Sequence, residues 1–168
     1  MGPMWPRVAI LGSAGGGWAW KARGVDVVAD LEAPYPAAVV WDVVSDLGTY
    51  PEWLDIVGRA VPAGDAAWTV DLRGKVGPFT RSKRLRMART LAQAPNNVLF
   101  EREELDGKEH SAWVLRAGLQ DAGSGACTLR MELHYGGSLF GPVLERVLGD
   151  TIERSRPRLL ALLEARAH

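Results

Sequence analysis

The sequence contains a single cysteine, Cys127, and only three histidines among its 168 residues. One cysteine excludes an internal disulfide, and a chain without disulfides is typical of a reducing compartment. The histidines lie far from one another and from Cys127, so they do not have the spacing of a metal-ligand motif. We therefore predict a cytoplasmic location, no bound metal and no cofactor.

The chain also lacks a surplus of charge of either sign, and it lacks a long apolar run. Lysine plus arginine and aspartate plus glutamate number 20 each, whereas a protein that binds nucleic-acid backbone needs excess positive charge on one face. No apolar run approaches the length that crosses a bilayer. These features argue against a general nucleic-acid binder and against an integral membrane segment, and the length suits one domain.

The first 24 residues differ from the rest because they are rich in glycine and lack a periodic apolar face. Residues 8–17 resemble a strand that enters a phosphate-binding glycine turn, but the middle glycine of that fingerprint is Ala14 and too few residues follow for its crossover helix. A secretory signal is a second interpretation, yet the glycines cut its apolar segment short. We expect residues 1–24 to be a flexible extension and residues 25–166 to form the folded domain.

From Val25 onward, the order of the predicted elements indicates an α+β fold. Residues 25–32 alternate apolar and polar side chains, which is the period of a half-buried strand. A short helix follows a proline-flanked break, and Gly48 is expected to end it. Further strands lead to Gly136-Gly137-Ser138, where Ser138 is the expected N-cap of a long apolar-striped helix that begins near Leu139. This order builds a curved sheet around one helix, with an apolar cavity between them. The stripe of the short helix consists of Val40, Val43, Val44 and Leu47.

One turn is used to derive the strand registers. Leu105-Asp106-Gly107-Lys108 has the composition of a tight type I′ hairpin, in which Leu105 pairs with Lys108. This pairing predicts the facing residues on both sides of the sheet. They are Phe100 with Trp113, Val98 with Leu115 and Arg102 with Ser111 on the inner side, and Glu103 with His110 and Leu99 with Val114 on the outer side.

The last predicted strand repeats the alternation, with residues 127, 129, 131, 133 and 135 on its inner face. His134 falls on the outer face, as His110 does, so the inner face has no histidine that could serve as a general base. Arg102 is the one charged residue that this register places on the inner face. If residue 111 pairs with residue 135, Tyr135 lies close to Arg102. A buried guanidinium needs an acceptor, which could be Tyr135, a backbone carbonyl, Glu104 or a ligand oxygen. Alternatively, Arg102 lies at the end of the sheet and reaches water.

The run of basic residues between Arg81 and Arg89 resembles a nucleic-acid patch, but the neighbouring strand is acidic. A register that places Arg84 opposite Glu103 and Arg86 opposite Glu101 explains the run as cross-strand ion pairs on the outer face.

The chain resembles the START/Bet v 1-like superfamily, the helix-grip proteins that include polyketide cyclases, coenzyme-Q-binding proteins and lipid carriers. The likeness covers roughly residues 25–163. It rests on Ala33-Pro34, on the helix Val40 to Asp46, on Tyr50-Pro51-Glu52-Trp53 and on Gly136-Gly137. The resemblance implies a seven-stranded antiparallel sheet that grips the last helix. It specifies a fold rather than an activity, because this fold hosts binders and enzymes alike.

Two classes of function follow from these features. The first is the binding or carriage of a small hydrophobic molecule, such as a polyketide, a quinone or a lipid, in the internal cavity. The second is a polyketide aromatase/cyclase or dehydratase, in which Arg102 stabilises an enolate and Tyr135 or Ser111 moves a proton. Ligand identity, catalytic residues, oligomeric state and the existence of any reaction stay open. The predicted ligand-binding residues are Met87, Phe100, Arg102, Ser111, Trp113, Leu115, Met131, Leu133 and Tyr135.

Overall fold

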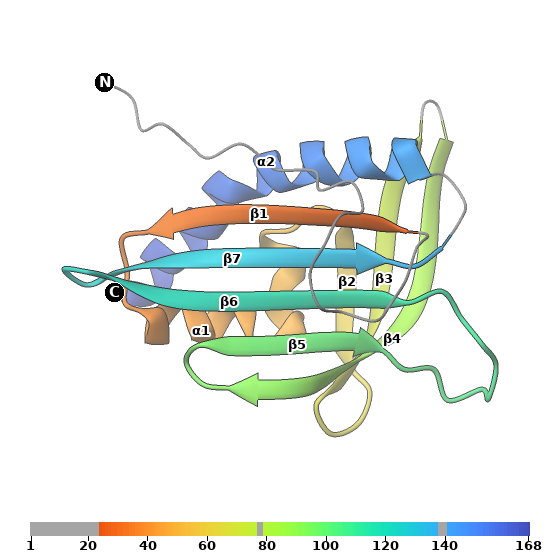
Figure 1. Cartoon of the computed structure of the whole chain (residues 1–168), viewed down its shortest axis with the longest axis horizontal. Coiled ribbons are helices and arrows are strands. Elements are labelled where there is room, and N and C mark those ends of the chain that lie inside the picture. Colours follow the sequence, from red (N-terminus) through yellow and green to blue (C-terminus); the bar gives the residue numbers. More distant parts are fainter. Residues whose placement is uncertain (1–23, 77–78, 138–140) are drawn as a thin grey trace.

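The computed structural model describes residues 24–76, 79–137 and 141–168. Over these residues the chain forms a seven-stranded antiparallel sheet with the strand order β1-β7-β6-β5-β4-β3-β2. Figure 1 shows that the sheet is strongly curved, because β2 and β3 run across the direction of β1, β7, β6 and β5. The strands are β1 Val25–Ala33, β2 Val57–Pro62, β3 Ala67–Val76, β4 Phe79–Gln93, β5 Asn97–Arg102, β6 Trp113–Gly123 and β7 Ala126–Tyr135, and the helices are α1 Ala37–Val44, the 3₁₀ helix η1 Leu47–Glu52 and α2 Gly141–Ala167.

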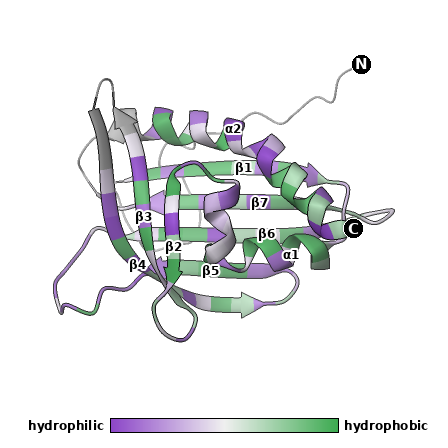
Figure 2. Ribbon diagram, turned by 180° about the vertical axis from the view of Figure 1, so that it is seen from behind, coloured by the Kyte–Doolittle hydropathy of each residue, from purple (hydrophilic) through white to green (hydrophobic). Residues whose placement is uncertain are grey.

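The two α-helices lie on the same, concave face of the sheet, as Figure 2 shows. The apolar residues of the strands point to this face, and Val25, Val27 and Leu31 of β1 are buried there as the alternation predicts. Helix α2 contributes Leu148, Leu159 and Leu163 to the same core. The architecture confirms the predicted α+β helix-grip fold. Ser138 and residues 1–23 lie outside the described residues, so the N-cap and the flexible extension stay predictions.

The short first helix ends earlier than predicted. Its last residue is Val44 rather than one next to Gly48, and a separate 3₁₀ helix begins at Leu47. The physical reason is Asp46, whose carboxylate accepts a hydrogen bond of 2.8 Å from the amide of Gly48 and so starts a new turn. The predicted apolar stripe is nevertheless correct, because its residues are all buried.

Side chains satisfy the carbonyl groups at the end of α1. The hydroxyl of Thr49 donates to the carbonyl of Val43 at 2.7 Å, and the hydroxyl of Tyr50 donates to that of Val44 at 2.8 Å. Arg89 Nη1, from β4, donates to the carbonyl of Ser45 at 2.8 Å. Helix ends leave such carbonyls without partners inside the helix, so these bonds fix the corner between α1 and η1 against the sheet.

The prediction of a tight hairpin at residues 105–108 is wrong. Strand β5 ends at Arg102 and β6 begins at Trp113, so residues 103–112 form a longer segment, here called the polar loop. Phe100 pairs with Leu115 rather than with Trp113, a shift of two residues. A shift of two keeps every side chain on its predicted face, because the side-chain period of a strand is two. Three more predicted pairs depended on this hairpin and are also wrong, namely Val98 with Leu115, Leu99 with Val114 and Glu103 with His110.

Local hydrogen bonds explain why the polar loop replaces the hairpin. Asp106 Oδ1 accepts from the amide of Lys108 at 3.0 Å, and Asp106 Oδ2 lies 2.8 Å from His110 Nε2. These bonds offer the backbone an alternative to strand pairing. His110 therefore lies in the loop beside Asp106 rather than beside Glu103 on the outer face.

Two further register predictions are wrong. Met87 pairs with Arg102 and Ala88 with Glu101, so Arg86 does not face Glu101. Arg84 instead pairs with Asp71 of β3, at 2.7 Å, so its ion-pair partner comes from the other neighbouring strand. On the far side of the sheet, Tyr135 pairs with Trp113 and not with residue 111.

Candidate functional site

A cavity of about 70 Å³ lies between α2 and the concave face of the sheet. We call it the α2 cavity. Its floor comes from β1, β7 and β6, its roof from α2, and one wall from the segment that joins η1 to β2. The lining residues are Val27, Ala29, Asp30, Leu31, Trp53, Leu54, Ile56, Leu115, Leu129, Met131, Leu133, Leu148, Thr151, Ile152, Ser155, Arg156 and Leu159.

The floor of the α2 cavity is open where small and flexible side chains meet. Ala29 pairs with Met131, and Met131 pairs on its other side with Ala117. Ala29 lines the cavity and leaves the space that a larger residue would occupy, and methionine is the apolar side chain that adapts most readily to a changing contour. The sequence thus places the cavity on this row through side-chain size.

The polar side chains that line the α2 cavity come from its roof. Thr151, Ser155 and Arg156 are buried on α2, in line with the apolar residues that face the sheet. Ser155 donates from its hydroxyl to the carbonyl of Thr151 at 2.7 Å, one turn earlier in the helix. The guanidinium of Arg156 donates from Nη1 to the carbonyl of Asp30 at 2.5 Å and lies 3.3 Å from Glu153 Oε1.

Asp30 contributes its backbone to this bond, because its carboxylate pairs on the outer face of the sheet. There it accepts two hydrogen bonds from Arg130, at 2.8 and 3.0 Å. The hydrogen bond and the charge of Arg130 hold the pKa of Asp30 below its ordinary value against the opposing effect of burial, and Arg156 adds a smaller electrostatic contribution. Asp30 therefore stays ionised beside Arg130, and its charge also acts on Arg156.

Trp53 forms part of the wall and is also a core residue. Its ring lies 4.7 Å from the ring of Tyr50, and only 3% of its surface is exposed. The buried indole nitrogen Nε1 has no hydrogen-bond partner among the residues that the structure describes. The phenol of Tyr50 is fully buried, and this burial raises its pKa beyond any physiological range. Tyr50 therefore serves as a structural donor to Val44 and not as an acid or base.

The structure separates the nine predicted ligand-binding residues into two groups. Leu115, Met131 and Leu133 line the α2 cavity. The other six lie outside the lining given above, on β4 and β5, at the ends of β6 and β7 or, for Ser111, in the polar loop. Four of them are buried on the concave face as predicted, namely Met87, Phe100, Trp113 and Tyr135, while Arg102 and Ser111 lie at the junction of β5, β6 and the loop.

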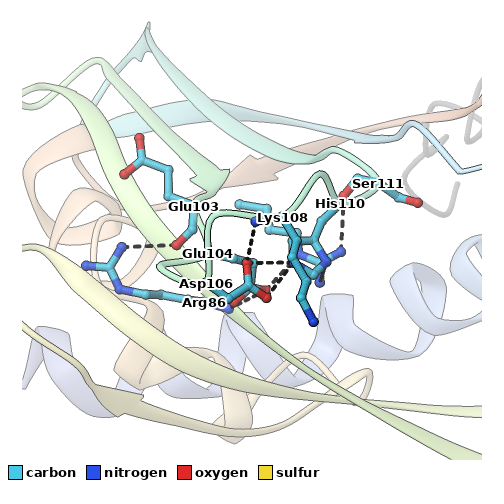
Figure 3. A network of polar contacts seen from close by, with 8 residues as sticks. Arg86, Glu103, Glu104, Asp106, Lys108, His110 and Ser111 are labelled. Atoms are coloured by element: carbon cyan, nitrogen blue, oxygen red, sulfur yellow. Dashed lines mark hydrogen bonds and ion pairs between the residues drawn. The ribbon is translucent and has the colours of Figure 1, made fainter.

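Arg102 holds the polar loop together through its guanidinium. Figure 3 shows the polar network of the loop, with Glu104, Asp106, His110 and Ser111 labelled. Its side chain is only 7% exposed, and its Nε donates to Glu104 Oε1 at 2.8 Å. Its Nη1 donates to the carbonyl of Ser111 at 3.2 Å, and its Nη2 lies 3.3 Å from His110 Nδ1. Of the acceptors considered from the sequence, the structure brings Glu104 and a backbone carbonyl to Arg102.

The contacts of His110 assign its tautomer. A guanidinium can only donate, so His110 Nδ1 must accept from Arg102, and the proton of the neutral ring must sit on Nε2, which then donates to Asp106. The pKa of Asp106 is lowered by the amide of Lys108 and by this bond to His110. The loop is thus a continuous chain of polar contacts that begins at Arg102.

A second cation lies near the same end of the concave face. Lys83 Nζ sits 6.0 Å from the centre of the Tyr135 ring, which in turn lies 4.6 Å from the ring of Trp113. Loss of hydration lowers the pKa of Lys83, and the charge of Arg102 lowers it further, with Glu104 opposing. Large aromatic and cationic side chains therefore occupy this end.

Sequence reasoning missed most of the cavity wall, including Trp53, Leu54 and Ile56, and all of the roof. One signal in the sequence could have found the roof. The apolar stripe of the last helix is interrupted between Ile152 and Leu159, where Ser155 and Arg156 occupy positions that helical spacing turns toward the sheet.

Two classes of site are not seen in the described part of the chain. Among residues 24–76, 79–137 and 141–168, no group of three or more histidine, cysteine, aspartate or glutamate side chains is arranged to hold a metal ion. Within the same residues, no helix is both long enough and apolar enough to span a bilayer.

Comparisons with known proteins agree with this architecture. A family model described as polyketide cyclase/dehydrase and lipid transport matches residues 33–160. A START superfamily protein from Mycobacterium smegmatis is similar in structure, with 16% identity and a TM-score of 0.65 over 83% of this chain and 97% of the other. A conserved protein from Geobacillus kaustophilus shows 12% identity and a TM-score of 0.67 over 84% and 96%.

An aromatase/cyclase, Zhui, from a Streptomyces species shows 14% identity and a TM-score of 0.58 over 87% of this chain and 97% of the other. Identities this low show a shared fold and nothing finer. No curated protein matches the sequence significantly.

Proposed function

The chain belongs to the polyketide cyclase/dehydrase and lipid transport family, and we propose that it binds or carries a small hydrophobic molecule in the α2 cavity. The observation that carries this proposal is the lining. Apart from the group on α2 and Asp30 of β1, the residues that enclose the space are aliphatic, methionine or tryptophan. Such a surface gains free energy when it is covered by an apolar ligand, at roughly 25 cal/mol per Å² of buried apolar area.

The size of the α2 cavity sets a condition on binding. Its volume of about 70 Å³ is well below the ~300–1,000 Å³ that is usual for small-molecule pockets. A ligand of that size enters only if side chains move apart. Leu54, Met131 and Ile152 line the space and are only partly buried, so they are the ones with room to move. We therefore expect the cavity to expand as it fills.

The experiment fills the α2 cavity with a larger side chain, so that a ligand can no longer occupy it. Ala29→Leu adds three carbon atoms to the floor, and we expect it to weaken the binding of the neutral fluorophore Nile red by at least about tenfold, the equivalent of ~1.4 kcal/mol. Ala92→Leu makes the same change at an exposed position on β4 and serves as the control. Native mass spectrometry of the purified protein would identify any molecule that co-purifies. Unchanged Nile red binding by Ala29→Leu would place the site elsewhere.

A second candidate function is that of an aromatase/cyclase or dehydratase. Its support is the family description and the position of Arg102 in the same cross-strand row of the sheet as Trp113 and Tyr135. Arg102 would stabilise an enolate and Tyr135 would move a proton, as a positioned donor and acid–base pair can. Turnover of a poly-β-keto thioester by the wild type, lost in Tyr135→Phe, would favour this function over carriage.

A further inference from the structure

Trp53 carries a buried hydrogen-bond donor without an acceptor. Its side chain lines the α2 cavity, only 3% of its surface is exposed, and its Nε1 has no hydrogen-bond partner within residues 24–76, 79–137 and 141–168. A buried indole N–H usually finds a partner, because burial without one forfeits the hydrogen bond that the group makes to water in the unfolded chain. An unpaired donor in the wall of a binding cavity therefore indicates the kind of atom that a ligand would bring.

The indole ring of Trp53 is held in place by η1. It lies 4.7 Å from the ring of Tyr50, which is fully buried and donates its hydroxyl to the carbonyl of Val44 at 2.8 Å. The backbone amide of Trp53 donates to the carbonyl of Tyr50 at 3.1 Å, where η1 ends. Because these contacts fix the ring before a ligand arrives, little conformational freedom is lost when Nε1 gains an acceptor.

The polar side chains of the roof do not specify a ligand in the same way. Thr151 and Ser155 carry hydroxyl groups, which can donate or accept, and the hydroxyl of Ser155 already donates to the carbonyl of Thr151. Arg156 is bonded to the carbonyl of Asp30 and pairs with a carboxylate on its own helix. An indole N–H can only donate. Trp53 therefore sets a requirement for an acceptor that the hydroxyl groups do not set.

We infer that Trp53 determines specificity in the α2 cavity, because the ligand has an apolar body and a neutral oxygen, such as that of a ketone, which accepts a hydrogen bond from Nε1. This inference rests on the proposed function and adds the chemical class of the ligand. A neutral oxygen is favoured over an ionised one, since burial of a charge against the apolar floor costs far more than burial of a carbonyl. Nε1 is buried in the ligand-free protein, so the oxygen reaches it as side chains move apart, a movement that the cavity volume already requires.

The test uses two ligands of nearly equal shape. Acetophenone and ethylbenzene share a phenyl ring, which is followed by a carbonyl in the first and by a methylene in the second. Both are titrated by displacement of Nile red, and the ratio of their Kd values is compared between proteins, so that a change in cavity shape acts on both ligands and cancels. Trp53→Phe removes the donor and should lower the preference for acetophenone by at least about threefold, within the range of one neutral hydrogen bond.

Trp113 offers a matched control. Its Nε1 is also buried without a hydrogen-bond partner in the part of the chain that the structure describes, but Trp113 is not among the residues that line the α2 cavity. Trp113→Phe should therefore leave the ratio of the two Kd values unchanged. A smaller change than threefold in Trp53→Phe, or an equal change in Trp113→Phe, would overturn the inference while leaving the proposed function intact.

A measurement on the wild-type protein decides the matter if Trp53→Phe does not fold. In an NMR spectrum of the indole N–H groups, the Hε1 resonance of Trp53 should lie farther downfield with acetophenone than with ethylbenzene, because a hydrogen bond deshields the proton. The same position with both ligands would contradict the inference. If Nile red and both ligands fail to bind to the wild type, the proposed function itself is wrong, and so is the inference that rests on it.

Discussion

Two rows of residues cross the same concave face of the sheet, and they differ in side-chain size. One row contains Val25, Tyr135 and Trp113, and continues through Arg102, Met87 and Trp68. The other contains Ala29, Met131 and Ala117. In the first row the rings of Trp113 and Tyr135 lie in contact, whereas Ala29 and Met131 of the second row line the α2 cavity. Alternation assigns both rows to one face, and it is side-chain volume that decides which of them leaves space.

The largest expected effect comes from the row of large residues. Arg102→Met removes the cation paired with Glu104 and leaves its mostly buried carboxylate with the Arg86 amide as a hydrogen-bond donor. We expect the free energy of unfolding to fall by roughly 2–4 kcal/mol in urea denaturation. Arg84→Met removes an arginine that is 69% exposed from its pair with Asp71, and should cost at most about 1 kcal/mol. Similar losses in the two variants would show that Arg102 reaches water, and the contrast between the rows would weaken.

A smaller effect is expected where a glycine touches the same row. A Cβ atom added at Gly137 would overlap the hydroxyl oxygen of Tyr135. Gly137→Ala must therefore displace the Tyr135 ring, and we expect a loss of about 1–3 kcal/mol in unfolding free energy. Gly149→Ala is the matched control, since nothing lies within 4 Å of the added atom on α2, and helix propensity should make it more stable by about 0.5–1 kcal/mol. A loss of stability in both variants would contradict this account.

The smallest effect is expected at the N-terminal end of the row. We propose that residues 1–23 add little to the stability of the domain, because strand β1 is already paired with β7 from Val25 to Ala33. Deletion of residues 1–23 should change the melting temperature by no more than about 2 °C, the equivalent of less than ~0.5 kcal/mol for a domain of this size. A cooperative loss of folding on deletion would show that the segment is part of the core.

The sequence was most informative at the corner between α1 and η1. The motif residues Asp46 and Tyr50, and Thr49 between them, use their side chains to bond backbone groups, and these bonds specify a unique local path. This explains why the resemblance identifies a fold rather than a ligand. The motif residues stabilise the turn between α1 and η1, and of these residues Trp53 also lines the α2 cavity.

The face of each strand could be predicted, but the strand partners could not. Parity survives a shift of two residues, so Trp113 and Leu115 were placed on the correct face although their partners were wrong. The composition of residues 105–108 predicted a tight hairpin that does not form. The side chains of Asp106 and Arg102 stabilise a longer loop instead, and composition alone does not reveal such bonds. The cavity depends on how α2 lies over the sheet, which is a contact between distant segments that no local pattern contains.

The bond between Arg156 and the carbonyl of Asp30 has a consequence for solubility. Strand β1 is the terminal strand of the sheet, and an unpaired strand edge is a template on which a second chain can add a strand. Arg156 occupies a backbone acceptor in the middle of β1, and the ion pair of Asp30 with Arg130 places charge at the same residue. An edge that is capped and charged at its centre is a poor template for intermolecular strand addition. The helix that roofs the cavity therefore also shields the β1 edge, one of the two edges of the sheet.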